Sequence, residues 1–177
     1  MLQAVPFAVT FAATAQDRPA PLPTRDVDVT YRSQQGNQVL EQRSRFAAGA
    51  QRMRLDTPTP GLYVIVDYRA HTMAMVSTAD RGVLDMPAPA TGAPGMAAAG
   101  MYVRQGDDRV AGLPCTEWQA KDTQGQPAVA CYTADGVMLR ARRGTQVLAV
   151  AIRVAYGPVD AALFTIPDGY DHVARKP

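Results

Sequence analysis

Hydrophobic and polar residues alternate along most of the chain, in short runs that end at turn-forming residues. Val27, Val29 and Tyr31 alternate with polar neighbours, which is the period of a strand with one buried face. The same period recurs over 146–157, in the run QVLAVAIRVAYG. Helical patterns are few, and the run VDAALF at 159–164 predicts one or two helical turns. The pattern therefore predicts a chain built almost entirely of strands.

The remaining strand-like runs are short and bounded by Gly, Pro, Asn or Asp. They cover 38–46, 51–57, 62–68, 71–77 and 81–86, and then 101–105, 109–121, 128–134 and 136–142. The triplets DRG at 80–82 and ADG at 134–136 carry hairpin-turn residues. Roughly nine to eleven strands with short turns predict a mainly β fold. We expect an antiparallel, strongly curved sheet or incomplete half-barrel with little helix.

Three segments fall outside the strand pattern. Residues 1–15 are largely apolar and close on the small-x-small triplet ATA, which predicts a signal peptide; the alternative is a short buried N-terminal element. Residues 16–25 form a Pro-rich leader, and 87–100 a flexible Gly/Pro/Ala loop within a single β-rich domain over 26–174. We therefore expect a periplasmic or secreted protein with no transmembrane segment in the mature chain.

Composition excludes several classes of function. The 177 residues are 47% hydrophobic and 19% charged, as in an ordinary globular domain, and the net charge of +2 gives no support for a nucleic-acid partner. The chain contains no G-x-S-x-G, no H-E-x-x-H, no phosphate-binding glycine loop and no dinucleotide fingerprint. We expect a protein that is not an enzyme and that needs no cofactor.

The chain has two cysteines, Cys115 and Cys131, too few for a zinc site and too far apart for a C-x-x-C redox motif. They lie in two strand-like runs joined by DTQGQ, and in a hairpin centred near Thr123 they would face each other. In an oxidising compartment such a pair forms a disulfide. The alternative, two buried free thiols, needs a reducing compartment.

One strand combines a histidine with two thioethers. His71, Met73 and Met75 are spaced two apart and would share a strand face, a donor set that suits Cu(I) in an exported protein. The alternative is that the methionines fill an irregular apolar interior. Because further methionines are scattered along the chain, we expect the apolar interior and no metal site.

An arginine-rich hairpin predicts a basic surface. The pairs expected across the turn AAGA are Arg45 with Arg52, Arg43 with Arg54, and Glu41 with Asp56. All six side chains would share one face, and the excess of arginine over acid makes Arg43, Arg45, Arg52 and Arg54 candidates for binding a phosphate or carboxylate. The alternative is a solvated face whose charges are screened.

Over roughly residues 26–172, the chain resembles a known group of proteins, and the second half carries the clearest motifs. The runs RVAGLPCTEWQAKDTQGQPAVACYTADGVMLRAR and AIRVAYGPVDAALFTIPDGY resemble exported bacterial domains related to the periplasmic lipoprotein-carrier (LolA/LolB-like) superfamily. The resemblance implies an open half-barrel with an apolar concave interior that holds acyl chains. The carriers begin with a substantial helix, which the leader QDRPAPLPT does not form.

The resemblance also implies which side chains line the interior. These are Tyr31, Leu40, Phe46, Met53, Leu55, Met73, Met75, Val150, Ile152 and Val154, together with Val27, Val29, Leu148 and Tyr156. We expect an exported binding protein for a hydrophobic or amphipathic ligand, such as a lipid or an acylated protein, with an envelope protein as a further partner. The alternatives are a structural or protein-interaction module with a filled core and, less favoured, a periplasmic Cu(I)-binding protein.

Overall fold

The computed structural model describes residues 18–88, 101–122 and 124–174, which form one sheet of twelve strands and one short 3₁₀ helix. The first six strands are β1 (Val27–Gln35), β2 (Gln38–Ala47), β3 (Arg52–Asp56), β4 (Leu62–Asp67), β5 (Thr72–Ser77) and β6 (Gly82–Pro87). The others are β7 (Val103–Val110), β8 (Leu113–Lys121), β9 (Pro127–Tyr132), β10 (Met138–Arg143), β11 (Gln146–Tyr156) and β12 (Asp171–Ala174), with the helix η1 at Ala161–Phe164.

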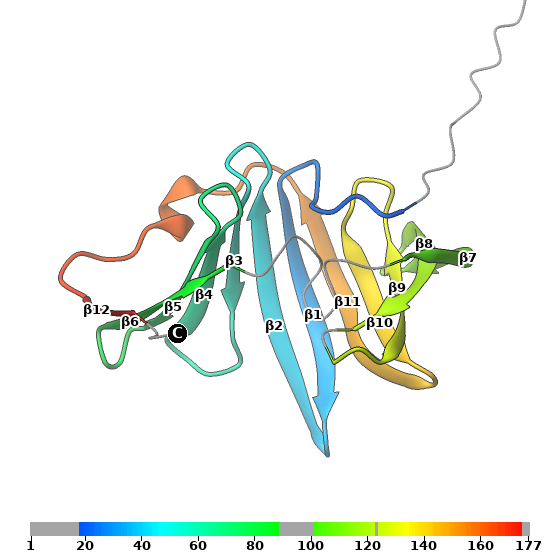
Figure 1. Ribbon diagram of the computed structural model, residues 1–177, viewed down its shortest axis with the longest axis horizontal. Helices are drawn as coiled ribbons and strands as arrows, with labels where there is room; N and C mark the ends of the chain where they lie inside the picture. Colours follow the sequence, from blue (N-terminus) through cyan, green and yellow to red (C-terminus); the bar gives the residue numbers. More distant parts are fainter. Residues whose placement is uncertain (1–17, 89–100, 123, 175–177) are drawn as a thin grey trace, which may run out of the picture.

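The sheet has the order β12-β6-β5-β4-β3-β2-β1-β11-β10-β9-β8-β7. Neighbouring strands are antiparallel, except that β12 runs parallel to β6. Figure 1 shows the long strands β1, β2 and β11 in the middle and the shorter strands bending away on both sides. The sheet is not closed, because β12 and β7 remain as its two edges. The predicted fold class, a strongly curved antiparallel sheet with little helix, is confirmed.

The sheet bends around a buried cluster that we call the main core. It contains Val27, Val29, Phe46, Val66, Tyr68, Val110, Cys115, Cys131, Val137, Leu139 and Ala151. In the strand order, β4 and β7 are separated by several strands, and neighbouring strands are about 4.8 Å apart. In a flat sheet their residues would therefore be too far apart to belong to one cluster. We call the face that carries Val27, Val29, Phe46 and Val66 the inner face, and the opposite face the outer face.

The outer face of β4–β6 is covered by residues 158–174, which we call the C-terminal segment. Phe164 of η1 is buried there with Tyr63, Ile65, Ala74, Val76 and Val83. Asp160 caps η1 by accepting a hydrogen bond from the Ala162 amide at 2.9 Å. The segment then adds β12 to the edge of the sheet, where the Asp171 amide donates to the Arg81 carbonyl. The run predicted as helical thus forms a single 3₁₀ turn, and β12 is a strand that the sequence pattern did not predict.

The leader is part of the fold. The Thr24 amide donates to the Asp135 carbonyl at 2.9 Å, and Arg25 forms an ion pair with the Asp135 carboxylate. Asp26 accepts from the amides of Ala48 and Val159, which joins the β2–β3 turn to the start of the C-terminal segment. The proposed signal peptide at 1–15 and most of the loop at 87–100 lie outside the described residues.

Three details of strand pairing differ from the sequence-based expectation. The run 109–121 contains the turn between β7 and β8 rather than one strand, because Ala111 and Gly112 both have positive φ, as in a type I′ hairpin turn. In the arginine hairpin, Ala47 pairs with Arg52, so the predicted register was wrong by two residues. The six charged side chains still share one face, because a shift of two preserves strand alternation.

The same shift occurs in the cysteine hairpin. Glu117, not Cys115, lies opposite Cys131, so the two cysteines are diagonal neighbours. The predicted disulfide between Cys115 and Cys131 is nevertheless present, with a Cα–Cα distance of 5.5 Å. Diagonal neighbours can be linked here because their Cα–Cα distance lies within the range that a disulfide spans.

Candidate functional site

Two apolar rows cross the inner face of β3–β6. In the first, Met53 pairs with Val66, Val66 with Met73, and Met73 with Met86. In the second, Leu55 pairs with Val64, Val64 with Met75, and Met75 with Leu84. Residues paired in register point to the same face, so the rows lie side by side.

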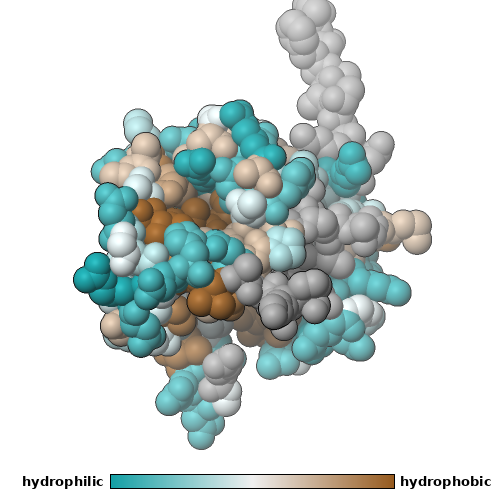
Figure 2. Space-filling model, turned by 60° about the vertical axis from the view of Figure 1, so that its left-hand side comes forward, coloured by the Kyte–Doolittle hydropathy of each residue, from teal (hydrophilic) through white to brown (hydrophobic). Residues whose placement is uncertain are grey.

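The side chains of these rows are mostly half-buried. Val66 is 1% exposed, but Met53, Leu55, Val64, Met73, Met75, Leu84 and Met86 all retain partial exposure. Figure 2 turns the side that carries β4–β6 toward the viewer and shows apolar residues exposed in patches between polar ones. These seven half-buried apolar side chains lie next to one another on one face of neighbouring strands, and Met53, Val64 and Met73 also pack against the main core. We call these seven residues the apolar surface.

The centre of the inner face, by contrast, is filled. A cavity of about 50 Å³ remains between the leader residues 21–23, strands β1 and β2, and residues 136–138. A water molecule occupies about 30 Å³ in the liquid, so this space does not hold an acyl chain. Among the described residues, the half-buried apolar side chains that pair in the two rows of the inner face lie on β3–β6.

The predicted lining residues divide between these two regions. Met53, Leu55, Met73 and Met75 belong to the apolar surface, whereas Phe46 is buried in the main core. Tyr31, Val150 and Val154 pack against the main core, and Leu40 is half-buried on β2 opposite Ser33. Ile152 is 39% exposed, in the bulge of the β1–β11 pair. The binding role of these residues stays a prediction.

Sequence reasoning missed Val64, Leu84 and Met86, which complete the apolar surface. The signal was present, because all three lie in runs that were predicted as strands. In 62–67, however, both alternating sets are apolar, so the pattern alone does not tell which set faces inward. Only the register of the neighbouring strands decides it.

Tyr31 shows how the filled centre is held. Its hydroxyl donates to the Met138 carbonyl at 2.7 Å, and burial raises the pKa of this phenol. The tyrosine therefore stays protonated and links β1 to the start of β10. This contact satisfies a buried polar group and keeps the centre closed.

His71 does not continue the strand that carries Met73 and Met75. It lies exposed in the turn before β5, with a φ of 55°. The alternation that placed it on the face of the methionines therefore does not extend to it. Among the described residues, no group of three or more His, Cys, Asp and Glu side chains is arranged to hold a metal ion.

The four arginines of the predicted anion site lie on the outer face, and each is paired with an acid. Arg43 binds Asp28, Arg45 and Arg54 bind Asp56, and Arg52 binds Asp67. The hydrogen bond from Arg43 lowers the pKa of Asp28, although burial opposes this shift. An anion would have to compete with these carboxylates. The anion-binding role of the arginines stays a prediction.

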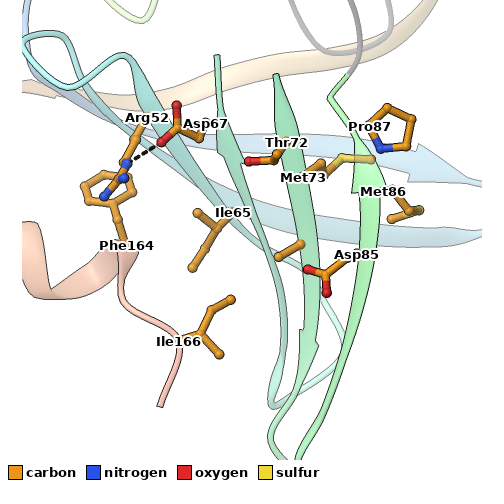
Figure 3. A pocket seen from close by; sticks show the side chains of 11 residues that line it. Arg52, Ile65, Asp67, Thr72, Met73, Asp85, Met86, Pro87, Phe164 and Ile166 are labelled. Atoms are coloured by element: carbon orange, nitrogen blue, oxygen red, sulfur yellow. Dashed lines mark hydrogen bonds and ion pairs between the residues drawn. The ribbon is translucent and has the colours of Figure 1, made fainter. Parts of the chain in front are cut away.

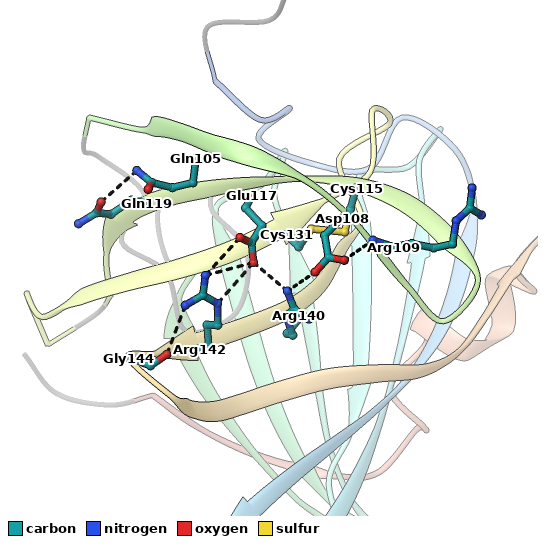
Figure 4. Close-up of polar contacts among 10 residues, drawn as sticks. All are labelled: Gln105, Asp108, Arg109, Cys115, Glu117, Gln119, Cys131, Arg140, Arg142 and Gly144. Atoms are coloured by element: carbon teal, nitrogen blue, oxygen red, sulfur yellow. Dashed lines mark hydrogen bonds and ion pairs between the residues drawn. A yellow bond between two sulfur atoms is a disulfide. The ribbon is translucent and has the colours of Figure 1, made fainter.

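A further polar network lies beside the disulfide on β7–β10 (Figure 4). Glu117 accepts from Arg140 at 2.8 Å and from Arg142 at 3.2 Å, and Arg140 also binds Asp108. Burial by itself raises the pKa of Glu117, but the hydrogen bonds from Arg142 and Arg140 outweigh it, and the pKa is lowered. The charges in this network are mutually satisfied, which is typical of a structural cluster.

Comparisons with solved structures support the fold. An uncharacterised conserved protein from Thermus thermophilus matches with a TM-score of 0.62 at 15% identity, over 86% of this chain and 91% of that chain. PNGF-II matches with a TM-score of 0.58 at 10% identity, over 85% of this chain and 31% of the other. The MucA/MucB complex of Pseudomonas aeruginosa matches with a TM-score of 0.52 at 16% identity, over 80% and 56%.

The matched structures also include a LolA superfamily protein from Nitrosomonas europaea. Its TM-score is 0.38 at 9% identity, over 83% of this chain and 92% of that chain. No protein-family model and no curated protein sequence matches the chain. Among the described residues, no helix is long and apolar enough to cross a membrane.

Proposed function

We propose that this protein is an exported, non-enzymatic binding protein for a hydrophobic or amphipathic ligand, and that the ligand lies on the apolar surface of β3–β6. The observation that carries the proposal is the pair of apolar rows, in which seven side chains on four strands remain half-buried. The chemical class is a lipid or the acyl chain of an acylated protein.

The composition of this surface suits a ligand of variable shape. Met53, Met73, Met75 and Met86 supply four of its seven side chains. Methionine is unbranched and polarizable, so it adapts to a partner that does not present one fixed surface. Burial of an alkyl chain here would contribute about 25 cal/mol per Å² of apolar area.

Two observations support an extracytoplasmic setting and a protein partner. The Cys115–Cys131 disulfide is of the kind that persists in oxidising compartments such as the periplasm. Among the matched folds, the MucB structure is a complex with MucA, which supports an envelope protein as a second partner of this chain. In that case the ligand would be the acylated part of such a protein, or a lipid that accompanies it.

Native mass spectrometry of the protein, purified without detergent from an oxidising periplasm, tests the proposal. We expect a mass lighter by the two thiol hydrogens, with a lipid-sized adduct or with uptake of added palmitate or lysophospholipid. The oxidised mass without any adduct or uptake would instead favour a module with a filled core. The nearly filled centre of the inner face is the observation in favour of that second function.

Replacing Met75 by alanine separates the two functions. Because Met75 is half-buried, we expect its truncation to reduce the free energy of unfolding by about 1 kcal/mol and to weaken palmitate binding at least as much. Val103→Ala is a matched control, since Val103 is 52% exposed on β7 at the far edge of the sheet. Loss of stability in Met75→Ala with unchanged palmitate binding would contradict the proposed site.

A further inference from the structure

A second cavity lies away from the centre of the inner face, between the C-terminal segment and the outer face of β4–β6. It has a volume of about 510 Å³, which is in the range of small-molecule sites. Figure 3 shows Phe164 and Ile166 of the C-terminal segment on one side of it and β4, β5 and β6 on the other. We call this space the outer cavity.

The deep part of the outer cavity is apolar and well ordered by packing. Ile65 and Phe164 are each 7% exposed and Ala74 is 9% exposed, and all three belong to one buried cluster. Phe164 is held in place because the Leu163 carbonyl beside it accepts a hydrogen bond from Arg54 at 3.0 Å. An alkyl or aryl group could rest against these side chains without rearranging them.

The rim carries two carboxylates and one guanidinium, and their contacts differ. Asp67 accepts from Arg52 at 2.7 Å and from the Ala70 amide at 2.8 Å. Arg52 and Asp67 therefore neutralise each other. Asp85 has one polar side-chain partner among the described residues, His172 at 2.7 Å, and the Asp85 side chain remains 45% exposed.

Asp85 is thus the rim charge with free hydrogen-bonding capacity. It lies on the same face as Ala74, its partner across the β5–β6 pair, so its carboxylate stands next to the apolar floor. Thr72, at the start of β5, adds a hydroxyl to the rim of the same cavity. A carboxylate and a hydroxyl beside an apolar floor match an ammonium group on an apolar body.

We propose that the outer cavity is a binding site for a small organic cation, an alkyl- or arylammonium whose apolar part contacts Ile65 and Phe164 and whose ammonium group binds Asp85. An anionic ligand is disfavoured, since the one arginine on the rim is already paired with Asp67. Met73 and Met86 of the apolar surface also line the outer cavity. The polar groups that would select an ammonium, Asp85 and Thr72, lie on the outer face and are not part of the proposed lipid site.

The test compares three probes of similar size in a titration followed by amide chemical shifts: 2-phenylethylammonium, 2-phenylethanol and 3-phenylpropanoate. We expect the ammonium probe to shift the amides of Thr72, Asp85 and Ile166. It should bind about tenfold more tightly than the alcohol, as one charge-assisted hydrogen bond provides. The carboxylate probe should bind most weakly.

Two variants and a control complete the test. Asp85→Asn should remove the preference for ammonium over alcohol, and Thr72→Trp, at an exposed strand position, should block all three probes. Glu41→Gln is the matched control, because Glu41 is 52% exposed and paired with Arg32. The proposal would be overturned if the three probes bound with equal affinity, or if only the amides of Met75 and Leu84 shifted. It would also be overturned if Asp85→Asn still preferred the ammonium probe over the alcohol. Because Asp85 lies on the outer face, palmitate uptake by Asp85→Asn tests the proposed lipid site on the inner face separately.

Discussion

At the scale of single residues, the turn at Gly136 joins the leader to the rest of the fold. Its φ is 87°, and a Cβ atom at this position would lie 2.7 Å from the Leu22 carbonyl oxygen. Both the backbone conformation and the close approach of the leader therefore require glycine. This close approach lies beside the hydrogen bond from Thr24 and the ion pair of Arg25, which both link the leader to Asp135.

Replacing Gly136 by alanine should destabilise the protein by about 1–3 kcal/mol, because strain at a positive φ adds to a clash with backbone. The measurement is the free energy of unfolding in urea. Gly144→Ala is the control, since Gly144 also has a positive φ, 56°, but nothing lies within 4 Å of its Cβ position. If both variants lost the same free energy of unfolding, the close approach of the leader to Gly136 would not contribute to the effect.

At the scale of elements, the hairpin of β8 and β9 is fastened by a covalent link. Cys115 and Cys131 are 5% and 1% exposed and lie in the main core. The link spans 16 residues and fixes the diagonal register of the two strands. The neighbouring Glu117 network acts on the same strands, through the half-buried Arg140 and Arg142.

Replacing both cysteines by alanine should lower the free energy of unfolding by about 3 kcal/mol, the value that the chain-entropy model assigns to a loop of this length. Reduction of the native protein should reproduce most of this loss in urea denaturation. A loss below about 1 kcal/mol in both experiments would show that packing alone holds the hairpin.

At the scale of the whole molecule, acidic side chains on distant elements are ionised more readily than in the unfolded chain. Burial would raise the pKa of Asp135, but hydrogen bonds from Thr133, Arg25 and Tyr156 lower it. The pKa values of Asp28 and Glu117 are lowered as well. A carboxyl group with a lowered folded-state pKa contributes stability above its unfolded pKa, which is about 4, and loses it as the pH falls through the folded value.

The protein should therefore lose stability below about pH 4 and show little change between about pH 5 and pH 7 from these groups. In Asp135→Asn, stability should be lower at pH 7, and its decline in acid should be shallower. Thermal unfolding measured from pH 2 to pH 7 checks both. Parallel curves for the variant and the native protein would contradict the role assigned to Asp135.

How far the sequence predicts the structure differs between elements. Strands such as β1 and β11 follow from alternation, because one side chain in two must face the core. The turn at Ala111 and Gly112 was missed because alanine seldom adopts a positive φ, and Gly112 by itself does not specify a two-residue turn inside a strand-like run. β12 was missed because a strand of four residues, of which Asp171, His172 and Val173 are exposed, carries little pattern of its own.

The sequence by itself determined the class of the fold and the cysteine pair, since both depend on local periodicity and on two residues that have no other partner. The tertiary structure alone decided which apolar residues of the inner face are fully buried and which stay half-buried. The leader fills the centre and the rows over β3–β6 stay half-buried, and this follows from long-range packing. It also decided that the C-terminal segment covers the outer face, because burying Phe164 against Ile65 requires contacts between residues about a hundred positions apart.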